Sequence, residues 1–445
     1  MATETVPAET VHANPARPSA EELNRPKGAT RIIGIDLARG LALIGMITAH
    51  FGLSQGPELM DPATWGGLVN GRSSVLFAVL AGVSLAIITG RHTPYSGPQM
   101  ANARIKIVVR ALCIIAIGAL LTGLNSNIAI ILQTYGFLFI TAIPLLRLKR
   151  WQLAGIAFCW AIIGPFLVAV LEPALEAAGL SLPFAGLLIW DTYPALTWFP
   201  YIVMGLAVGR MDLARWGNAL FLLIVGALIA ILGYTSVSGL PPASSELELG
   251  QGTGIDQDLG TDLGSKDWTD GALEETPEGT FIDESGNKFI PFEEFAASQN
   301  LDGQGLTGDE YISDRPGDRI IENLSMWNSA EPHSNTPFEI IGSGGFAVAV
   351  IGFCLLIGSA VRVIFAPIIA LGTMSLTVYT VHVFSFRIMQ DSVMATDGLS
   401  MTPWLWSLIL LGLGALIWQK TLGRGPLERL VTAIVNRTVG GPSNT

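Results

Sequence analysis

Three ionisable side chains interrupt the first long apolar stretch of the sequence, residues 32–53. Asp36 and Arg39 are three residues apart, so on a helix they can form an ion pair. His50 lies fourteen residues beyond Asp36, which is about 21 Å along a helix. Ionisable groups cost roughly 2.5–3.5 kcal/mol each on membrane-insertion scales, so they usually have a function or a partner there.

Two further histidines are expected on the same side of the membrane as His50. His333 immediately precedes a late apolar stretch, and His382 lies toward the end of the next one. Imidazole is the usual general base near neutral pH, so the three histidines predict an acid–base site. Each histidine alone is equally well explained as a hydrogen-bonded residue at the membrane interface.

The second apolar stretch, residues 65–89, begins with polar side chains that could assist such a base. Asn70 and Arg72 are candidates for stabilising a developing oxyanion. Arg72 could instead hold an anionic group, pair with Asp61 or Glu339, or extend to the lipid headgroups.

Two other polar residues have structural explanations. Glu339 follows Thr336 and Pro337 in a capping-box pattern, which predicts the start of a helix. Ser343, within the small-residue run 342–345, indicates close helix packing more than a nucleophile.

The composition predicts an integral membrane protein. The chain is 50% hydrophobic and 14% charged, and its mean hydropathy is +0.50, whereas soluble domains carry about 25% charged residues. The sequence has no GxSxG, Walker or HExxH motif and no dinucleotide-binding fingerprint, so a hydrolase triad, an ATPase and a zinc protease have little support. We predict no metal site and no nucleic-acid partner.

The elements that must position these residues are about ten transmembrane helices, which makes the fold an all-α polytopic membrane protein. Lys and Arg concentrate in alternate loops, which under the positive-inside rule predicts cytoplasmic N and C termini and a multi-pass protein of the plasma membrane. The predicted spans are 32–53, 65–89, 105–123, 128–146, 152–172, 194–209, 214–235, 338–360, 363–386 and 403–420.

One large acidic insert separates the helices into two groups. Residues 236–337 contain 21 Asp and Glu but only 4 Lys and Arg, whereas the whole chain has a net charge of −11. We therefore expect a disordered cytoplasmic tail (1–31), transmembrane helices 1–7 (32–235), an extracytoplasmic insert (236–337), helices 8–10 (338–420) and a cytoplasmic C-terminal segment (421–445).

The run 279–295 within the insert has two interpretations. Apolar residues flank a Ser-Gly-Asn turn, which predicts a β-hairpin. The alternative is a degenerate calcium loop, although Lys288 occupies the position that normally needs glycine. Its ligands would be Asp283, Ser285, Asn287 and Glu294.

Several of these segments resemble the transmembrane acyltransferases related to heparan-α-glucosaminide N-acetyltransferase. The first is RIIGIDLARGLALIGMITAH (31–50), followed by DPATWGGLVNGRSSVLFAVLAGVSLAI (61–87). The later segments are similar to the YeiB-type bacterial branch: EPHSNTPFEIIGSGGFAVAVIGFCLLI (331–357), APIIALGTMSLTVYTVHVF (366–384) and WQKTLGRGPLERL (418–430).

The resemblance implies an enzyme that moves an acyl group from cytoplasmic acyl-CoA to a sugar on the far side of the membrane. The donor substrate would be acetyl-CoA or another acyl-CoA, bound near Asp36 and Arg39. The acceptor would be a hydroxyl or amine of an envelope glycan or glycolipid. A homodimer is left open.

One feature of the family is missing from this sequence. The family enzyme uses a histidine in the loop after the first span, where this chain has Asp61-Pro62-Ala63-Thr64. His50 matches a family asparagine near the site, so we predict that His50, with His333 or His382, supplies the base.

The main alternative is a proton-coupled transporter or flippase of a lipid or anionic solute. The buried Asp36, Arg39 and histidines would then relay protons, and the run 342–345 would break a helix. A non-catalytic sensor whose acidic insert binds a partner is a third interpretation.

Overall fold

The computed structural model of the 445-residue chain describes residues 31–51, 69–126, 128–180, 186–190, 192–236, 329–394 and 401–439, with short pieces at 273–275, 281–283, 288–289, 320, 323–324 and 327. The helices and strands below all belong to one unit, Ile33–Thr445. The predicted N-terminal tail, Asp61 with the segment around it, and most of the acidic insert lie outside the described residues.

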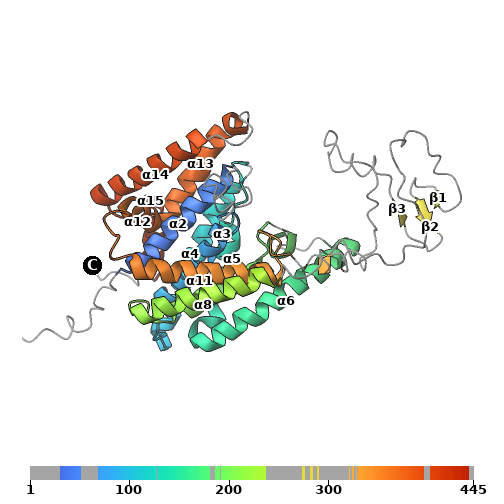
Figure 1. The fold of residues 1–445 in the computed structure, drawn as a ribbon, viewed down its shortest axis with the longest axis horizontal. Helices are drawn as coiled ribbons and strands as arrows, with labels where there is room; N and C mark the ends of the chain where they lie inside the picture. The colour runs from blue at the N-terminus through green and yellow to red at the C-terminus, as the bar shows by residue number, and fades with distance from the viewer. Residues whose placement is uncertain are drawn as a thin grey trace, which may run out of the picture. The chain divides into compact units, whose positions relative to one another are not determined.

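The described part of the chain consists almost wholly of helices (Figure 1). Before the insert these are α2 (Ile33–His50), α3 (Arg72–Ile88), α4 (Gly97–Thr122), α5 (Leu132–Thr141), α6 (Arg150–Ala177), α7 (Ala195–Gly209) and α8 (Trp216–Thr235). After it come α11 (Pro337–Ile357), α12 (Ala366–Thr373), α13 (Ser375–Met394), α14 (Met401–Thr421) and α15 (Pro426–Val439). A 3₁₀-helix, η2 (Ile143–Arg147), and a π-helical turn, η3 (Gly186–Trp190), complete the helical elements.

The apolar helices confirm the prediction of a helical membrane protein. Five described helices (α2, α4, α6, α8 and α11) are long and apolar enough to cross a bilayer. The bent pairs α12–α13 and α14–α15 raise that number to seven if each pair is one span, and α3 and α7 are shorter apolar helices. Each of the ten predicted stretches contains a described helix, but the count of ten and the orientation of the termini stay predictions.

Helix α2 is the central helix of this group. In the 18-residue apolar window of each helix, 67% of the α2 residues are buried, whereas only 22% of those of α4 and 28% of those of α8 are. It contacts α3, α11, α12, α13 and α14. The helix that carries Asp36, Arg39 and His50 is therefore surrounded by protein more than by lipid.

A close approach between α2 and α12 fixes where α13 begins. A side chain at Gly40 would collide with the backbone of Ile368, and one at Gly372 would collide with the backbone of Asp36. Because both positions are glycine, the two helices can pack with their backbones almost in contact. The chain then bends by 92° between α12 and α13.

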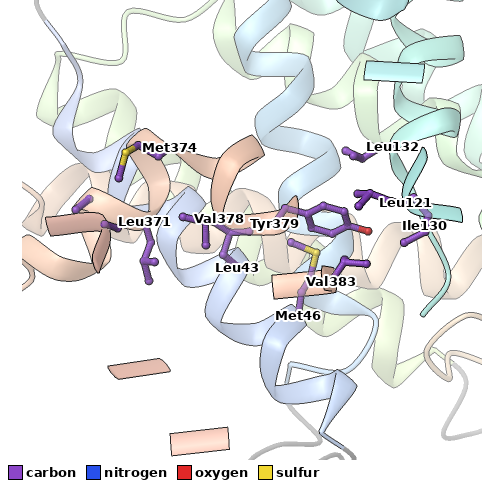
Figure 2. Packing of buried hydrophobic residues seen from close by; sticks show 12 residues of the cluster. Leu43, Met46, Leu121, Ile130, Leu132, Leu371, Met374, Val378, Tyr379 and Val383 are labelled. Carbon is purple, nitrogen blue, oxygen red and sulfur yellow. The ribbon is translucent and has the colours of Figure 1, made fainter. Parts of the chain in front are cut away.

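The bend brings α13 against α2 and the α4–α5 region. Figure 2 shows the apolar side chains of these elements gathered around the ring of Tyr379. The buried members of this cluster include Leu43 and Met46 of α2, Leu121 of α4, Leu132 of α5, and Val378, Tyr379 and Val383 of α13.

Helices α8 and α11 lie side by side through a second set of glycines (Figure 1). A side chain at Gly233 would meet the backbone of Gly342, and one at Gly345 would meet the backbone of Ala230. This confirms the expectation of close packing around Ser343. Helix α11 also continues without interruption through residues 342–345, so the helix break that the transporter alternative requires is absent there.

The insert contributes three short described strands, which the all-α prediction did not include. These are β1 (Leu273–Glu275), β2 (Phe281–Asp283) and β3 (Lys288–Phe289). Strand β2 pairs antiparallel with both neighbours, in the order β1-β2-β3. The β2–β3 pairing agrees with the predicted hairpin, while three of the four residues of the calcium-loop alternative lie outside the described ones.

Arg210, directly after α7, binds two parts of the chain that are distant from it in sequence: residues 86–91 at the end of α3, and Leu146 of η2. Its guanidinium donates to the carbonyl oxygens of Ala86, Arg91 and Leu146 and to the hydroxyl of Thr89. Burial lowers the pKa of Arg210 to about 10, so the side chain stays charged at neutral pH. The carbonyls that it binds include those near the C-terminal ends of α3 and η2, where a cation is favourable.

We expect Arg210→Gln to lower the free energy of unfolding by about 3 kcal/mol, because charge-assisted hydrogen bonds are lost and buried carbonyls lose their donors. Thermal unfolding in detergent measures the change. Arg215→Gln is the control, because that side chain is 78% exposed and pairs with Asp212, and it should change stability by less than about 0.5 kcal/mol. Equal melting temperatures for the two variants would contradict this role.

Candidate active site

His50 and His382 form a hydrogen-bonded pair between α2 and α13. The Nδ1 atom of His50 lies 2.9 Å from Nε2 of His382, and the two rings are stacked with an interplanar angle of 6°. The sequence predicted that these two residues would lie on one side of the membrane. The structure brings them into direct contact across 332 positions of sequence.

Aromatic side chains enclose the pair. Phe51 and Phe386 lie against the imidazoles and pack edge to face with each other. Only 3% of His382 is exposed. The indole of Trp404 donates to the hydroxyl of Thr48, which ties α14 to α2 beside the pair. The imidazoles therefore lie in an apolar environment, where proton positions are decided by the hydrogen bond between them.

The hydrogen bond restricts the pair to complementary tautomers. A neutral imidazole has one N–H donor and one acceptor nitrogen, so one ring must donate and the other accept. When His50 donates from Nδ1 to His382, its Nε2 carries a lone pair and can accept a proton. If His50 then becomes protonated, its Nδ1–H still donates to His382. The arrangement is that of a general base held by a second residue.

A cavity of about 230 Å³ lies between α2, α3, α4, α5, α12, α13 and α15. Arg39 and Arg110 line it together with Ser84, and Tyr135 and Tyr379 line it together with Phe77. On α3, Ser84 is hydrogen-bonded to Arg39. Phe77 lies seven residues before Ser84, about 10 Å away along the same helix, and its ring stacks on Tyr135 of α5. The cavity thus has a cationic end and a tyrosine end.

The cationic end contains the predicted pair Asp36–Arg39. The Arg39 Nη1 atom lies 3.5 Å from Oδ1 of Asp36, and Nη2 donates to Ser84 Oγ at 2.6 Å. These contacts hold the guanidinium at the cavity wall. The charges of Arg39 and Arg424 both act on Arg110, so three arginines concentrate positive charge here.

Glu428 of α15 is the acidic residue that lines this cavity. Its carboxylate accepts the backbone N–H groups of Leu376 and Thr377 and the hydroxyl of Thr377. A carboxylate at a helix N-terminus is favourable because it binds N–H groups that have no partner within the helix. Glu428 therefore fixes the first turn of α13, and with it the direction of Tyr379 and His382.

The tyrosine end of the cavity includes a residue of α13, the helix that carries His382. Tyr379 lines the cavity, and His382 follows three residues later on α13, about 4.5 Å along the helix. The side chains of α2 opposite them, Leu43 and Met46, belong to the same cluster as Tyr379 and precede His50. A linear molecule in the cavity would therefore point from the arginines toward the imidazoles.

His333 lies in a different network, in the segment before α11. Its ring packs edge to face on Tyr193, and its backbone N–H donates to Glu339. Glu339 also accepts from the backbone of Asn335, and its own N–H donates to the hydroxyl of Thr336. The predicted capping residue Thr336 is confirmed, but the Glu339 carboxylate binds the N–H groups of residues 333 and 335.

Arg72 and Asn70 lie near this network at the start of α3. Arg72 Nε donates to the Tyr234 hydroxyl at 2.8 Å, and its guanidinium lies over the Tyr234 ring. The Tyr234 hydroxyl is also hydrogen-bonded to Ser343. The charge of Arg72 acts on Glu339, one of the two partners that the sequence suggested. Asn70 contributes its backbone carbonyl, which accepts from the N–H of Arg72.

Residues 31–238 match the family described as heparan-alpha-glucosaminide N-acetyltransferase, catalytic. The matched residues, somewhat less than half of the chain, are similar to the heparan-alpha-glucosaminide N-acetyltransferase family. The match supports acetyltransferase activity in a membrane protein. No match was found among curated proteins, and none among solved structures.

The family match extends from α2 to the end of α8 and so includes one side of the candidate site. His50, Arg39, Arg110 and Tyr135 fall within it, whereas Tyr379, His382 and Glu428 do not. These last three residues are outside the matched range, and only the fold brings them next to the residues inside it. Membership of the YeiB-type branch stays a prediction.

The sequence analysis did not single out several residues that line the cavity between the arginines and the tyrosines: Ser84, Tyr135, Tyr379, Glu428 and Thr432. A signal for the two tyrosines was present, because a hydroxyl within an apolar span needs a partner. Tyr135 donates to the carbonyl of Ser74. No comparable signal marked Glu428, since it lies after the last predicted span.

Within the described residues, no group of three or more His, Cys, Asp or Glu side chains could hold a metal ion.

Burial lowers the pKa of His333 below its ordinary value of 6.5, and this predicts a pH-dependent stability. As the pH falls through about 6.5, the unfolded chain takes up a proton at this position before the folded protein does. Stability is therefore lost below about pH 6.5, until the pH reaches the lower pKa of the folded state.

We expect His333→Asn to remove this part of the pH dependence, and asparagine tolerates the positive φ of 67° at this position. The measurement is the melting temperature of both proteins between pH 8 and pH 5. The wild-type curve should fall more steeply toward pH 5 than that of the variant. Parallel curves would show that His333 is not buried in its neutral form.

Proposed function

We propose that the protein is a membrane acetyltransferase that uses acetyl-CoA from the cytoplasm. The acceptor is a hydroxyl or amine of a sugar or glycolipid of the cell envelope, on the extracytoplasmic side of the plasma membrane. The observation that carries this proposal is the cavity with arginines at one end and the His50–His382 pair beyond the other. The family match of residues 31–238 supports the acetyl group as the one transferred.

The cationic end suits the phosphate groups of the donor. Arginine binds phosphate through paired, charge-assisted hydrogen bonds, and Arg39 and Arg110 face the same cavity. The distribution of basic residues assigns this end to the cytoplasm. The remaining wall is mostly apolar, which suits the uncharged arm that carries the thioester.

The tyrosine end would receive the thioester next to the histidine pair. His50 Nε2 takes the proton of the acceptor hydroxyl or amine as the oxygen or nitrogen bonds to the thioester carbon. The carbon–sulfur bond breaks, and the proton goes from His50 to the leaving thiolate, which departs as CoA. In this reaction His50 is the catalytic base and His382 is the positioning residue that holds it.

The acceptor would approach from the side of Asn70, Arg72 and His333. Ser73 packs against Gly45, which lies five residues before His50, so the start of α3 is about 7.5 Å from the level of the pair along α2. We assign the stabilisation of the oxyanion to Arg72 or Asn70 and the binding of the acceptor to the segment around His333. A sugar, which has many hydroxyl groups, suits this polar end of the site.

The enzyme proposal predicts that purified protein consumes acetyl-CoA in the presence of an envelope glycolipid fraction. His50→Gln should lower kcat about 100-fold or more, because a positioned general base contributes about 10²–10⁴-fold. His382→Gln should lower kcat less, since the base remains but loses its partner. The measurements are release of free thiol and transfer of labelled acetyl to lipid.

His92→Gln is the matched control, because His92 is an exposed histidine in the loop after α3. It should keep the activity of the wild type. Consumption of acetyl-CoA that is equal in His50→Gln and wild type would refute the proposed base. A protein that neither binds nor consumes acetyl-CoA would instead favour the transporter alternative.

The donor site predicts a separate kinetic effect. Arg110→Gln should raise the KM for acetyl-CoA about 10-fold or more with little change in kcat, because a charged hydrogen bond contributes about 1.5–3 kcal/mol. Arg39→Gln should do the same and also lose stability, because the ion pair between Arg39 and Asp36 is lost. The exposed Arg437→Gln is the control.

Acetyl-pantetheine, which lacks the nucleotide and its diphosphate, distinguishes phosphate binding from general damage. Its KM should be unaffected by Arg110→Gln. An equal rise in KM for acetyl-CoA and acetyl-pantetheine would place the phosphates away from Arg110.

A further inference from the structure

A second cavity, of about 450 Å³, lies on the other side of the helical unit between α6, α7, α8 and α11. Most of its lining is apolar. Ala157 and Ala161 of α6 and Gly345 of α11 are among the small residues of its wall, and Phe158 and Phe221 are among the large ones. None of the residues assigned to the acetyltransferase site lines this cavity.

Along α6 and α8 the lining of the cavity is about as long as one leaflet of a bilayer. On α6 it is lined from Arg150 to Ala161, and on α8 from Asn218 to Ile229. Each interval is eleven residues, or about 16 Å of helix. The hydrocarbon core of a bilayer is about 30 Å thick, so half of it is about 15 Å.

The polar lining residues gather at one end. Arg150, Trp151 and Asn218 all lie in the first turn of α6 or α8. The Arg150 guanidinium lies 5.0 Å from the centre of the Trp151 ring. Arg147 and Lys149 add two further positive charges immediately before α6. The distribution of basic residues predicts that this end is cytoplasmic, and Trp with Arg is typical of the membrane interface.

We propose that this cavity binds one acyl chain of an anionic phospholipid from the cytoplasmic leaflet, with the phosphate at Arg150. The apolar wall takes the chain over the depth of one leaflet. The basic end provides charge complementarity for the headgroup, as basic sites between transmembrane helices do for anionic lipids. This site is independent of the proposed acetyl transfer.

Two variants test the chain and the headgroup separately. Ala157→Phe fills the cavity, and Gly155→Phe is its control because a Cβ at Gly155 would meet nothing within 4 Å. Arg150→Gln removes the headgroup charge, and Arg147→Gln removes an exposed charge three residues away. The full-length protein is reconstituted in nanodiscs that contain equal amounts of dioleoyl phosphatidylglycerol and dioleoyl phosphatidylethanolamine. It is then released from the nanodiscs, and native mass spectrometry measures the mass of the protein with its bound lipid.

The wild type should retain one phosphatidylglycerol. Ala157→Phe should lower the lipid-bound fraction at least fivefold, and Gly155→Phe should not. Arg150→Gln should keep the lipid but lower the preference for phosphatidylglycerol about fivefold, while Arg147→Gln keeps that preference.

Three results would overturn the proposal. The first is equal lipid retention by Ala157→Phe and Gly155→Phe. The second is the absence of a phosphatidylglycerol preference in the wild type. The third is a wild-type mass of two chains without lipid, together with a mass of one chain for Ala157→Phe. That result would mean that a second copy of the protein occupies the cavity. Arg150 is exposed, so its variant remains informative even if Ala157→Phe does not fold.

Discussion

The candidate site depends on the close approach of α2 and α12. Side chains larger than hydrogen at Gly40 and Gly372 would force the two backbones apart. That contact fixes the position of α12 against α2. The chain then bends by 92° between α12 and α13, so that α13 packs against α2. The hydrogen bond between His50 and His382 follows from this geometry. A membrane interior offers no water to polar groups, so two imidazoles on neighbouring helices are stable there when they bind each other.

The same constraint explains how the polar groups are distributed along the helices. Arg39 is held by Asp36 and Ser84, and Glu428 is held by the N-terminus of α13. Between them and the histidine pair, the helices present apolar and tyrosine side chains. The structure thus keeps the arginines, which we propose bind phosphate, apart from the two imidazoles, which we propose transfer the proton. An enzyme that joins a water-soluble donor to an acceptor across the membrane needs such a separation.

Part of this arrangement could be predicted from the sequence. The helical class, the Asp36–Arg39 pair, the Thr336 cap and the tight packing around Ser343 depend on local spacing or on composition, and each agrees with the structure. The grouping of three histidines required tertiary geometry. In the structure His382 contacts His50, whereas His333 contacts Tyr193 and the segment bound to Glu339.

The cavity could not be predicted, for a physical reason. Its walls come from helices that are distant in sequence, and residues such as Tyr379 and Glu428 become neighbours only because α12 and α13 bend. The 3₁₀ and π-helical segments and helix α15 were also missed, since their patterns are short or lie outside the apolar spans. The small sheet of the insert was anticipated only at the β2–β3 turn.

The most direct test of the central claim is a cryo-electron microscopy map of the protein with a non-hydrolysable thioether analogue of acetyl-CoA. We predict density for the phosphates beside Arg39 and Arg110, and for the acetyl end beside Tyr379 and the His50–His382 pair. Density for the analogue at any other place, or with its acetyl end away from the two histidines, would contradict it.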